Sequence, residues 1–239
     1  MTPGADKEQA ERLKVLYKIV KGDALTMVND KQVPSMGYRM AFMDVPYTLN
    51  GVGGFTADQF DNILIQILTL TTSDLFTLVV FCGHEQSCDF YSKLQAHFDQ
   101  VDKIYWYKPN HWISGFNRHA NQVEEGFVAV RKTGSEGGSG SSVLQQKLFY
   151  NWQKNDDEDD LQPGLSKNSY INTNVHYYNK VTKFYKYSGT AESQTLNPTQ
   201  KPLALMAALL ITYANGADWI LDVCAGSGSI AMAAVRNGI

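Results

Sequence analysis

The chain has 239 residues, of which 44% are hydrophobic and 19% charged, the proportions of an ordinary globular protein. This length suffices for one large α/β domain with an insertion, and no run of about 18 apolar residues predicts a membrane span. The net charge of −3 argues against a strongly basic nucleic-acid binder, so any phosphate-binding surface must be local.

The N-terminus and the cysteines bear on the compartment. Residues 1–12 are polar and charged and lack the apolar core of a signal peptide. Cys82, Cys88 and Cys224 form neither a CxxC pair nor an even disulfide framework. We therefore expect an intracellular protein, in the cytoplasm or nucleoid of a bacterium or the nucleus of a eukaryote. His84 and Cys88 have a helical i, i+4 spacing, but without a further ligand cluster we predict no metal site.

The first half of the chain predicts strands and helices in alternation. Thr56 and Gln59 resemble a capping box that opens a helix. The apolar residues after it share one helical face: Phe60, Ile63, Leu64, Ile67 and Leu68. In chain order, strands are expected over residues 15–20, 39–43, 76–81, 103–108 and 127–131, and a further helix over residues 85–98.

The last part of the chain repeats this alternation. A helix over residues 203–214 ends at Asn215-Gly216, a common stop signal. A strand over residues 219–223 then leads into a glycine turn, and another helix begins near Ser229. The whole pattern favours an α/β fold with a mostly parallel sheet and helices on both of its faces.

The middle of the chain differs in character. Residues 133–142 have the composition of a flexible linker, and residues 134–142 fit either a native loop or an engineered replacement. The acidic run 156–160 is typical of a solvated loop. Basic and aromatic side chains that could contact phosphates and bases are interleaved beyond it: Lys167, Tyr177, Tyr178, Lys180, Lys183 and Lys186. The same composition fits an aromatic-rich β insertion with surface lysines.

Asp44-Val45-Pro46-Tyr47, at the end of a predicted strand, could hold a base amine. The exocyclic amine of adenine or cytosine is a poor nucleophile because its lone pair is delocalised into the ring. A carboxylate and an adjacent backbone carbonyl can accept both N–H groups and localise that lone pair, and an aromatic ring can stack on a flipped-out base. Asp44, the Val45 carbonyl and Tyr47 supply these parts. In isolation, the tetrapeptide also fits an ordinary proline turn.

Two further motifs suit a small anionic ligand. Residues 222–229 join a strand to a helix through a turn of small residues that includes Gly226 and Gly228, and a helix N-terminus favours an anionic group. Asn197-Pro198-Thr199-Gln200-Lys201-Pro202 places hydroxyl, amide and ammonium groups at a helix start. Alone, the first motif fits any tight strand–helix turn and the second a proline-initiated helix.

Taken together and in this order, the three motifs resemble the β class of S-adenosylmethionine-dependent DNA amino-methyltransferases, the Asp-Pro-Pro-Tyr type. The resemblance implies a Rossmann-like methyltransferase fold that is circularly permuted, with the catalytic motif before the cofactor motif and a small recognition insertion. It implies that Asp44, Val45, Pro46 and Tyr47 form the catalytic turn. It places these residues at the cofactor: Asp23, Asp44, Thr199, Gln200, Lys201, Asp222, Gly226 and Gly228.

The resemblance divides the chain into three parts. Residues 1–132 are expected to be the catalytic half, residues 133–190 the linker and target-recognition insertion, and residues 191–239 the cofactor-binding half. Val45 stands where the family has its first proline, so a fixed φ is lost at that position. We also expect the cofactor-binding half to be incomplete, because a strand that carries a ribose-binding acidic residue follows this helix in the family.

The expected function is methylation of adenine N6 in DNA, on a flipped-out base, with S-adenosylmethionine as the donor. Asp44 favours adenine, since cytosine-N4 members more often begin this motif with Ser. The alternatives are a non-catalytic nucleic-acid-binding subunit of a methyltransferase complex, suggested by Val45, and the same chemistry on cytosine N4 or on RNA. A homodimer or a partner methyltransferase subunit is an expectation by analogy.

Overall fold

The computed structural model describes residues 18–29, 33, 37–47, 53–71, 75–109, 122–132, 175–178, 200–214 and 219–239. These residues form a six-stranded sheet in the order β5-β3-β4-β2-β1-β6. The strands are β1 Met40–Asp44, β2 Leu75–Cys82, β3 Gln100–Tyr107, β4 Val123–Lys132, β5 Val175–Tyr177 and β6 Ile220–Asp222.

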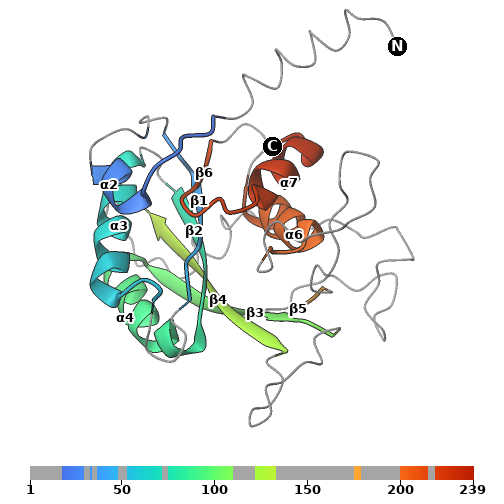
Figure 1. Ribbon diagram of the computed structural model, residues 1–239, viewed down its shortest axis with the longest axis horizontal. Coiled ribbons are helices and arrows are strands. Elements are labelled where there is room, and N and C mark those ends of the chain that lie inside the picture. The colour runs from blue at the N-terminus through green and yellow to red at the C-terminus, as the bar shows by residue number, and fades with distance from the viewer. Residues whose placement is uncertain are drawn as a thin grey trace, which may run out of the picture.

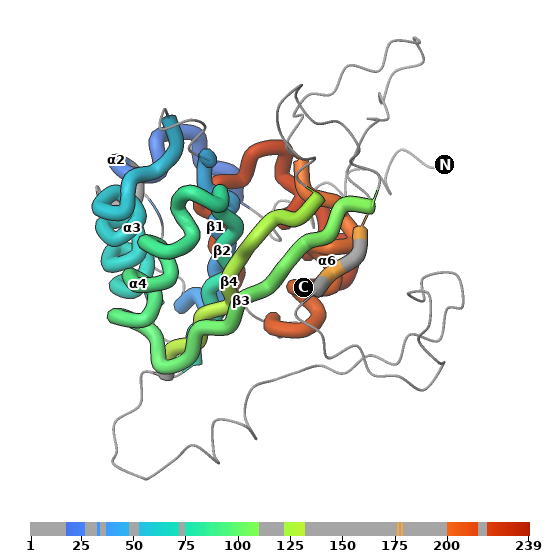
Figure 2. Tube along the Cα trace, turned by 90° about the horizontal axis from the view of Figure 1, so that it is seen from below, coloured from blue at the N-terminus to red at the C-terminus, as the bar shows by residue number. Residues whose placement is uncertain are grey.

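Helices cover both faces of this sheet, as expected (Figure 1). The helices are α2 Ala24–Asn29, α3 Ala57–Leu70, α4 Ser87–His97, α6 Leu203–Tyr213 and α7 Ser229–Asn237, with a short 3-10 helix, η1, at His84–Gln86. Figure 2 shows α3 and α4 on one side of the strands and α6 on the other. No helix in the described part of the chain combines the length and apolar character needed to cross a bilayer.

The two layers of helices explain the continuous apolar run of β2. Leu78 and Val80 belong to the core cluster beneath α3 and α4. Val79 and Phe81 belong to the cluster beneath α6 and α7. Because successive side chains of a strand point to opposite faces, a strand covered on both faces must be apolar throughout.

The predicted helix after Thr56 is confirmed in detail. Thr56 Oγ1 accepts a hydrogen bond from Gln59 N at 3.2 Å, and Gln59 Oε1 accepts one from Thr56 N at 2.9 Å. This capping box starts α3, and the spacing of the apolar residues after it determines which face of the helix is buried. On that face the Phe60 ring stacks on Phe90 of α4 with centroids 4.0 Å apart, whereas Leu68 is only partly buried.

The sheet is mixed rather than uniformly parallel. β1 pairs in parallel with β2 and β6, and β3 pairs in parallel with β5. β4 runs antiparallel to both of its neighbours, β2 and β3. The parallel part therefore holds the two strands that precede the catalytic and glycine turns, and β4 brings its N-terminal end to the same edge.

Two predicted elements, one strand and one helix, differ from those in the structure. The strand expected over residues 15–20 is wrong for its described part, because residues 18–20 form no ladder and Ile19 is 79% exposed. An apolar residue without a neighbouring strand has nothing to pair with. The helix expected over residues 85–98 is divided into η1 and α4.

Candidate active site

The catalytic turn and the glycine turn meet at one edge of the sheet. Asp44 is the last residue of β1, and Asp222 is the last residue of its parallel neighbour β6. Val223 N, just beyond β6, donates to Phe42 O at 3.0 Å. The carboxyl ends of adjacent parallel strands form the usual ligand-binding edge of an open α/β sheet.

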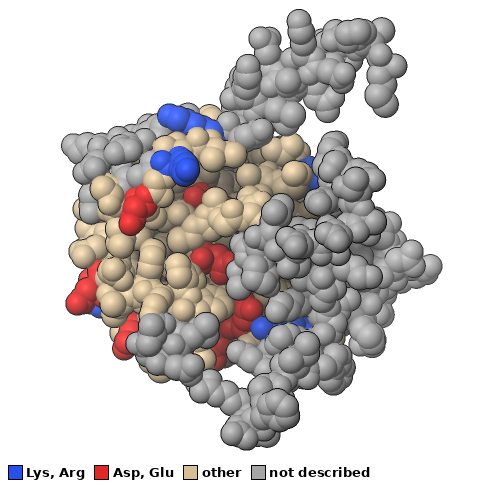
Figure 3. All heavy atoms as spheres, in the orientation of Figure 1, with Lys and Arg blue, Asp and Glu red and all other residues tan. Residues whose placement is uncertain are grey.

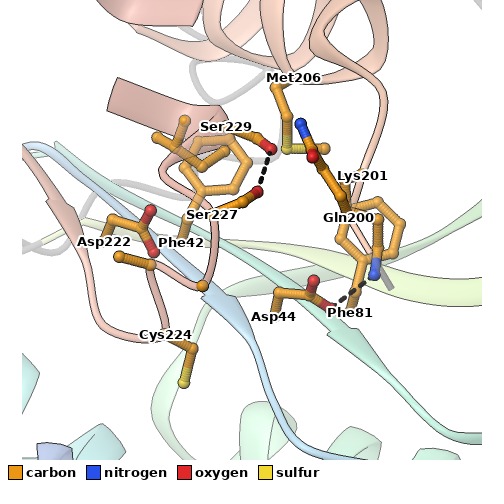
Figure 4. Close-up of a pocket in the computed structure, with 13 residues that line it drawn as sticks. Phe42, Asp44, Phe81, Gln200, Lys201, Met206, Asp222, Cys224, Ser227 and Ser229 are labelled. Atoms are coloured by element: carbon orange, nitrogen blue, oxygen red, sulfur yellow. Dashed lines mark hydrogen bonds and ion pairs between the residues drawn. The ribbon is translucent and has the colours of Figure 1, made fainter. Parts of the chain in front are cut away.

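A pocket lies at this edge and encloses about 390 Å³ of space that opens to solvent (Figure 4). Its walls come from β1, β2, the start of α6 and the glycine turn. The lining residues are Phe42, Asp44, Phe81, Gln200, Lys201, Met206, Asp222, Cys224, Ala225, Gly226, Ser227, Ser229 and Ile230.

The glycine turn leaves room for a ligand beside the start of α7. Gly226 and Gly228 have φ values of 52° and 76°, a left-handed conformation that other residues rarely adopt. An added Cβ at Gly228 would meet nothing within 4 Å, so the backbone conformation, not crowding, requires glycine there. The N-terminus of α7 follows directly at Ser229 and suits a carboxylate.

Gln200 indicates that a polar ligand belongs in this pocket. Its Oε1 atom is buried and accepts no hydrogen bond from the described residues. A buried acceptor without a donor is costly, so a ligand that carries N–H or O–H groups would satisfy it. The residues present therefore fit a small ligand with both donor groups and a carboxylate.

Asp44 lies in a network of charged and phenolic groups that come from four separate segments. Lys201 Nζ lies 2.6 Å from Asp44 Oδ1 and 3.0 Å from Glu124 Oε2. The Tyr47 hydroxyl donates to Glu124 Oε2 at 2.8 Å and accepts from Lys201 Nζ at 2.9 Å. Lys108 Nζ pairs with the other oxygen of Glu124 at 3.1 Å. Two carboxylates thus meet two ammonium groups, and the network is neutral.

Burial and these pairings set the pKa values. Burial raises the pKa of Asp44, and the Lys201 ammonium offsets only part of that rise. Burial also acts to raise the pKa of Glu124, but Lys201 and Lys108 outweigh it and hold that pKa below its usual value. Burial disfavours the Lys201 ammonium, yet Asp44 and Glu124 outweigh it and raise its pKa. Burial raises the pKa of Tyr47, so the phenol stays protonated.

Aromatic rings enclose the Lys201 ammonium. The side chain is 4% exposed, and its Nζ lies 5.1 Å from the Phe81 ring centroid, 5.2 Å from that of Tyr47 and 5.7 Å from that of Trp106. Ring faces attract a cation at this distance. The ion pairs and the rings together replace the water that the ammonium loses on burial.

A sequence profile described as DNA methylase matches residues 38–239 of the chain. The chain belongs to this family, the N6/N4 DNA amino-methyltransferases. The predicted family is therefore confirmed, and so is S-adenosylmethionine as the expected cofactor. A comparison with curated proteins found no match to the sequence.

Solved structures share the fold of this DNA methylase at low sequence identity. M1.HpyAVI is 19% identical with a TM-score of 0.58, and the match covers 92% of this chain and 87% of that one. Its complex with SAM is 18% identical with a TM-score of 0.58, covering 92% and 88%. PvuII DNA methyltransferase, described as cytosine-N4-specific, is 14% identical with a TM-score of 0.56, covering 90% and 76%.

The structure brings most of the expected cofactor residues of the methylase together. Asp44, Gln200, Lys201, Asp222 and Gly226 line the pocket. Gly228 shapes the turn without lining it. Asp23 also lies outside the lining and instead accepts a hydrogen bond from Leu25 N at 2.8 Å, at the start of α2. Thr199 lies outside the described residues.

The expected DNA-contacting residues are mostly beyond the described chain. Lys167, Lys180, Lys183 and Lys186 lie outside the described residues, and so does the side chain of Tyr177. Tyr178 packs against the core beneath α6, and its carbonyl accepts a hydrogen bond from Trp106 Nε1 at 2.7 Å. Acidic and basic side chains are scattered over the coloured part of the face in Figure 3, without a continuous basic surface.

Three polar residues around the catalytic turn were not predicted from the sequence: Lys108, Glu124 and Gln86. Lys108 directly follows β3 and Glu124 is the second residue of β4, so antiparallel pairing brings both to the edge where β1 ends. A charged residue beside a strand terminus was the available signal, but its partners could not be named without the strand order. Gln86 carried no such signal.

Proposed function

We propose that this DNA methylase transfers the methyl group of S-adenosylmethionine to N6 of adenine in DNA, on a base that has left the helix. One observation carries the proposal: the Asp44 carboxylate lines the same pocket as the glycine turn and Gln200. An acceptor for the amine and a site for the methyl donor are therefore adjacent, which suits direct transfer between two bound molecules.

Within the described residues, the catalytic turn has unpaired acceptors for both hydrogens of an exocyclic amine. Asp44 Oδ1 is engaged by Lys201 and Tyr47, but no donor among the described residues reaches Asp44 Oδ2. Val45 N donates to Phe81 O at 3.3 Å, whereas the Val45 carbonyl accepts from no described residue. Asp44 Oδ2 and Val45 O can then accept one N–H each and leave the nitrogen lone pair directed at the methyl group.

Tyr47 and Lys201 would orient the reactants and balance the charge of the site. S-adenosylmethionine, when bound, supplies the electrophilic methyl group. Tyr47 offers its ring face to the flipped base. On transfer the amine would give up one proton as it takes the methyl group from the sulfonium sulfur, and Asp44 Oδ2, which would accept that N–H, would be placed to take the proton. Lys201 stays charged throughout because its pKa is raised.

The chemistry of the lining residues suggests which part of the cofactor each of them binds. The N-terminus of α7 receives the carboxylate, and Gln200 Oε1 receives an N–H or O–H donor of the cofactor. Cys82 and Cys224 are poor nucleophiles, since burial raises the pKa of each thiol to about 12. Residues 133–190, with their lysines and tyrosines, are proposed to contact the DNA.

The choice of adenine rests on Asp44 at the first position of the turn. Cytosine N4 presents a similar amine, so product analysis must decide between them. We would measure transfer of tritium from labelled S-adenosylmethionine to unmethylated duplex DNA, followed by hydrolysis and separation of the nucleosides. The expected label is in N6-methyladenine, and label in N4-methylcytosine would overturn the choice of base.

Asp44→Ala is the decisive variant. We expect transfer to fall at least 100-fold, because the amine loses one of its two acceptors. Asp102→Ala, which changes a hydrogen-bonded aspartate on β3 outside the pocket, is the matched control and should keep its activity. Full turnover by Asp44→Ala would exclude the proposed mechanism. Cofactor binding without transfer by the wild-type chain would favour a non-catalytic subunit.

A further inference from the structure

Gln86 makes three hydrogen bonds to the segments around the catalytic turn. Its side-chain amide is buried, with the residue 5% exposed. Nε2 donates to Pro46 O at 3.2 Å and to Phe55 O at 2.9 Å, and Oε1 accepts from Gly83 N at 3.0 Å. One end of the amide faces two carbonyls and the other an N–H, so the partners determine its orientation.

One of these bonds ends the parallel ladder between β1 and β2. In a parallel pair, a residue donates to one residue of the neighbouring strand and accepts from the residue two positions later. Val45 N donates to Phe81 O, so the next bond of the ladder would run from Gly83 N to Val45 O. Gly83 N donates instead to Gln86 Oε1. The Val45 carbonyl is thereby left without a donor among the described residues.

The other two bonds anchor the turn itself. Pro46 O accepts from Phe55 N at 3.3 Å as well as from Gln86 Nε2. Phe55 O accepts from the second N–H of Gln86. Val45 lacks the ring that fixes φ in a proline, so its carbonyl direction depends on what holds the adjacent peptide. Gln86 holds that peptide from the start of α4, a separate segment.

We propose that Gln86 is the positioning residue of this site: it takes up the Gly83 amide and clamps the Pro46 carbonyl, so that Val45 O stays free and correctly aimed at the target amine. This inference rests on the proposed function. Gln86 does not line the pocket, so we expect it to contact neither cofactor nor base. Its loss should therefore change the rate of transfer and leave cofactor binding unaltered.

Gln86→Met is the first test, because it keeps the side-chain length and removes every hydrogen bond. Using the full chain, unmethylated DNA and labelled S-adenosylmethionine, we expect kcat to fall at least 10-fold. The dissociation constant for S-adenosylmethionine and the KM for DNA should each stay within about threefold of wild type. Gln59→Ala, which weakens the capping box of α3, is the control for a general loss of stability.

Gln86→Glu provides a pH readout that a purely structural role would not produce. Ionised, the new carboxylate can still accept from Gly83 N but repels the carbonyls of Pro46 and Phe55. Protonated, it can donate to one of them. We expect kcat relative to wild type to be lowest at pH 8 and to recover several-fold towards pH 6, measured well below the unfolding temperature of each variant.

The possible results distinguish failure of the Gln86 proposal from failure of the proposed function. No transfer by the wild-type chain on any DNA overturns the proposed function and the inference with it. Transfer by wild type, with kcat unchanged in a folded Gln86→Met, overturns the inference alone. A loss of kcat that Gln59→Ala reproduces, or one that comes with a matching loss of cofactor binding, overturns it as well. If Gln86→Met does not fold, the pH profile of Gln86→Glu decides.

Discussion

Lys201 Nζ and Asp44 Oδ1 lie 2.6 Å apart although 157 residues separate them along the chain. This ion pair ties the start of α6 to the end of β1, and so ties the cofactor side of the pocket to the catalytic turn. Lys201 also pairs with Glu124. In the proposed mechanism a base amine approaches Asp44, and the ammonium would then keep Glu124 as a carboxylate partner.

Lys201→Met should shift the pH dependence of transfer. Removal of the ammonium takes away the group that lowers the pKa of Asp44. It also leaves the repulsion from the Glu124 carboxylate unopposed, so the pKa of Asp44 rises further. In the proposed mechanism Asp44 must be ionised to accept the amine, so the acid limb of the kcat/KM profile should move to higher pH. An unchanged acid limb would show that Asp44 does not control it.

The same variant should also lose stability, by about 3–5 kcal/mol, because one partner of a buried pair is removed. Urea unfolding would measure this. Lys103→Met is the control, since its pair with Glu125 is longer, at 4.0 Å, and its side chain is 40% exposed. Changes at an exposed pair are expected to stay within about 1 kcal/mol.

Glu124→Gln should destabilise the protein through Lys108. The Lys108 side chain is 6% exposed, and Glu124 is its carboxylate partner. Loss of that carboxylate leaves a buried ammonium unpaired, at a cost of about 3 kcal/mol. Adding Lys108→Met should recover part of the loss, so a double-mutant cycle by urea unfolding should give a coupling energy above about 1 kcal/mol. Strict additivity would contradict the contact.

Asp222→Asn should flatten the dependence of stability on pH. Burial raises the pKa of Asp222 to about 7, with the Cys224 backbone N–H offsetting part of the rise. The folded state then binds a proton more tightly than the unfolded state does. This stabilisation is complete below the ordinary pKa of about 3.8 and is lost as pH rises through 7.

Without cofactor, we therefore expect wild type to lose about 1–2 kcal/mol between pH 5 and pH 8 through this partly exposed group. Asp222→Asn should lose correspondingly less over the same range, as measured by thermal unfolding at each pH. Equal slopes for the two proteins would mean that Asp222 titrates at its ordinary pKa.

Gly126→Ala should destabilise the sheet without touching the pocket. An added Cβ at Gly126 of β4 would lie 2.6 Å from Val80 O and 3.1 Å from Ile104 Cγ1. The nearest of these atoms is backbone and cannot turn aside, so strands must shift. We expect a loss of about 1–3 kcal/mol by urea unfolding. A change below about 0.5 kcal/mol would show that the sheet can adjust at this position.

Local patterns predicted those elements whose cause lies within a few residues. The capping box at Thr56 and Gln59 depends on bonds between residues three apart, and the turn at Gly226 depends on backbone freedom at single positions. The apolar run of β2 predicted a strand that is covered on both faces. These features follow from propensity and periodicity, which sequence carries directly.

The antiparallel direction of β4 could not be predicted from local sequence patterns. A strand of apolar residues reads alike whether its neighbours run parallel or antiparallel. The choice decides which terminus of β4 reaches the catalytic edge. Because β4 is antiparallel to β2, Glu124 near its N-terminal end, rather than a residue at its C-terminal end, contacts Tyr47 and Lys201.

Local motifs were sufficient to recognise the parts of this methylase: the Asp44 turn, the glycine turn, the Lys201 segment and their order along the chain. The contacts between these parts depend on the fold. It paired Lys201 with two carboxylates, buried that charge among aromatic rings and gave Gln86 the Gly83 amide. Desolvation and ion pairing depend on distance in space, and the sheet sets those distances between residues that the chain keeps far apart.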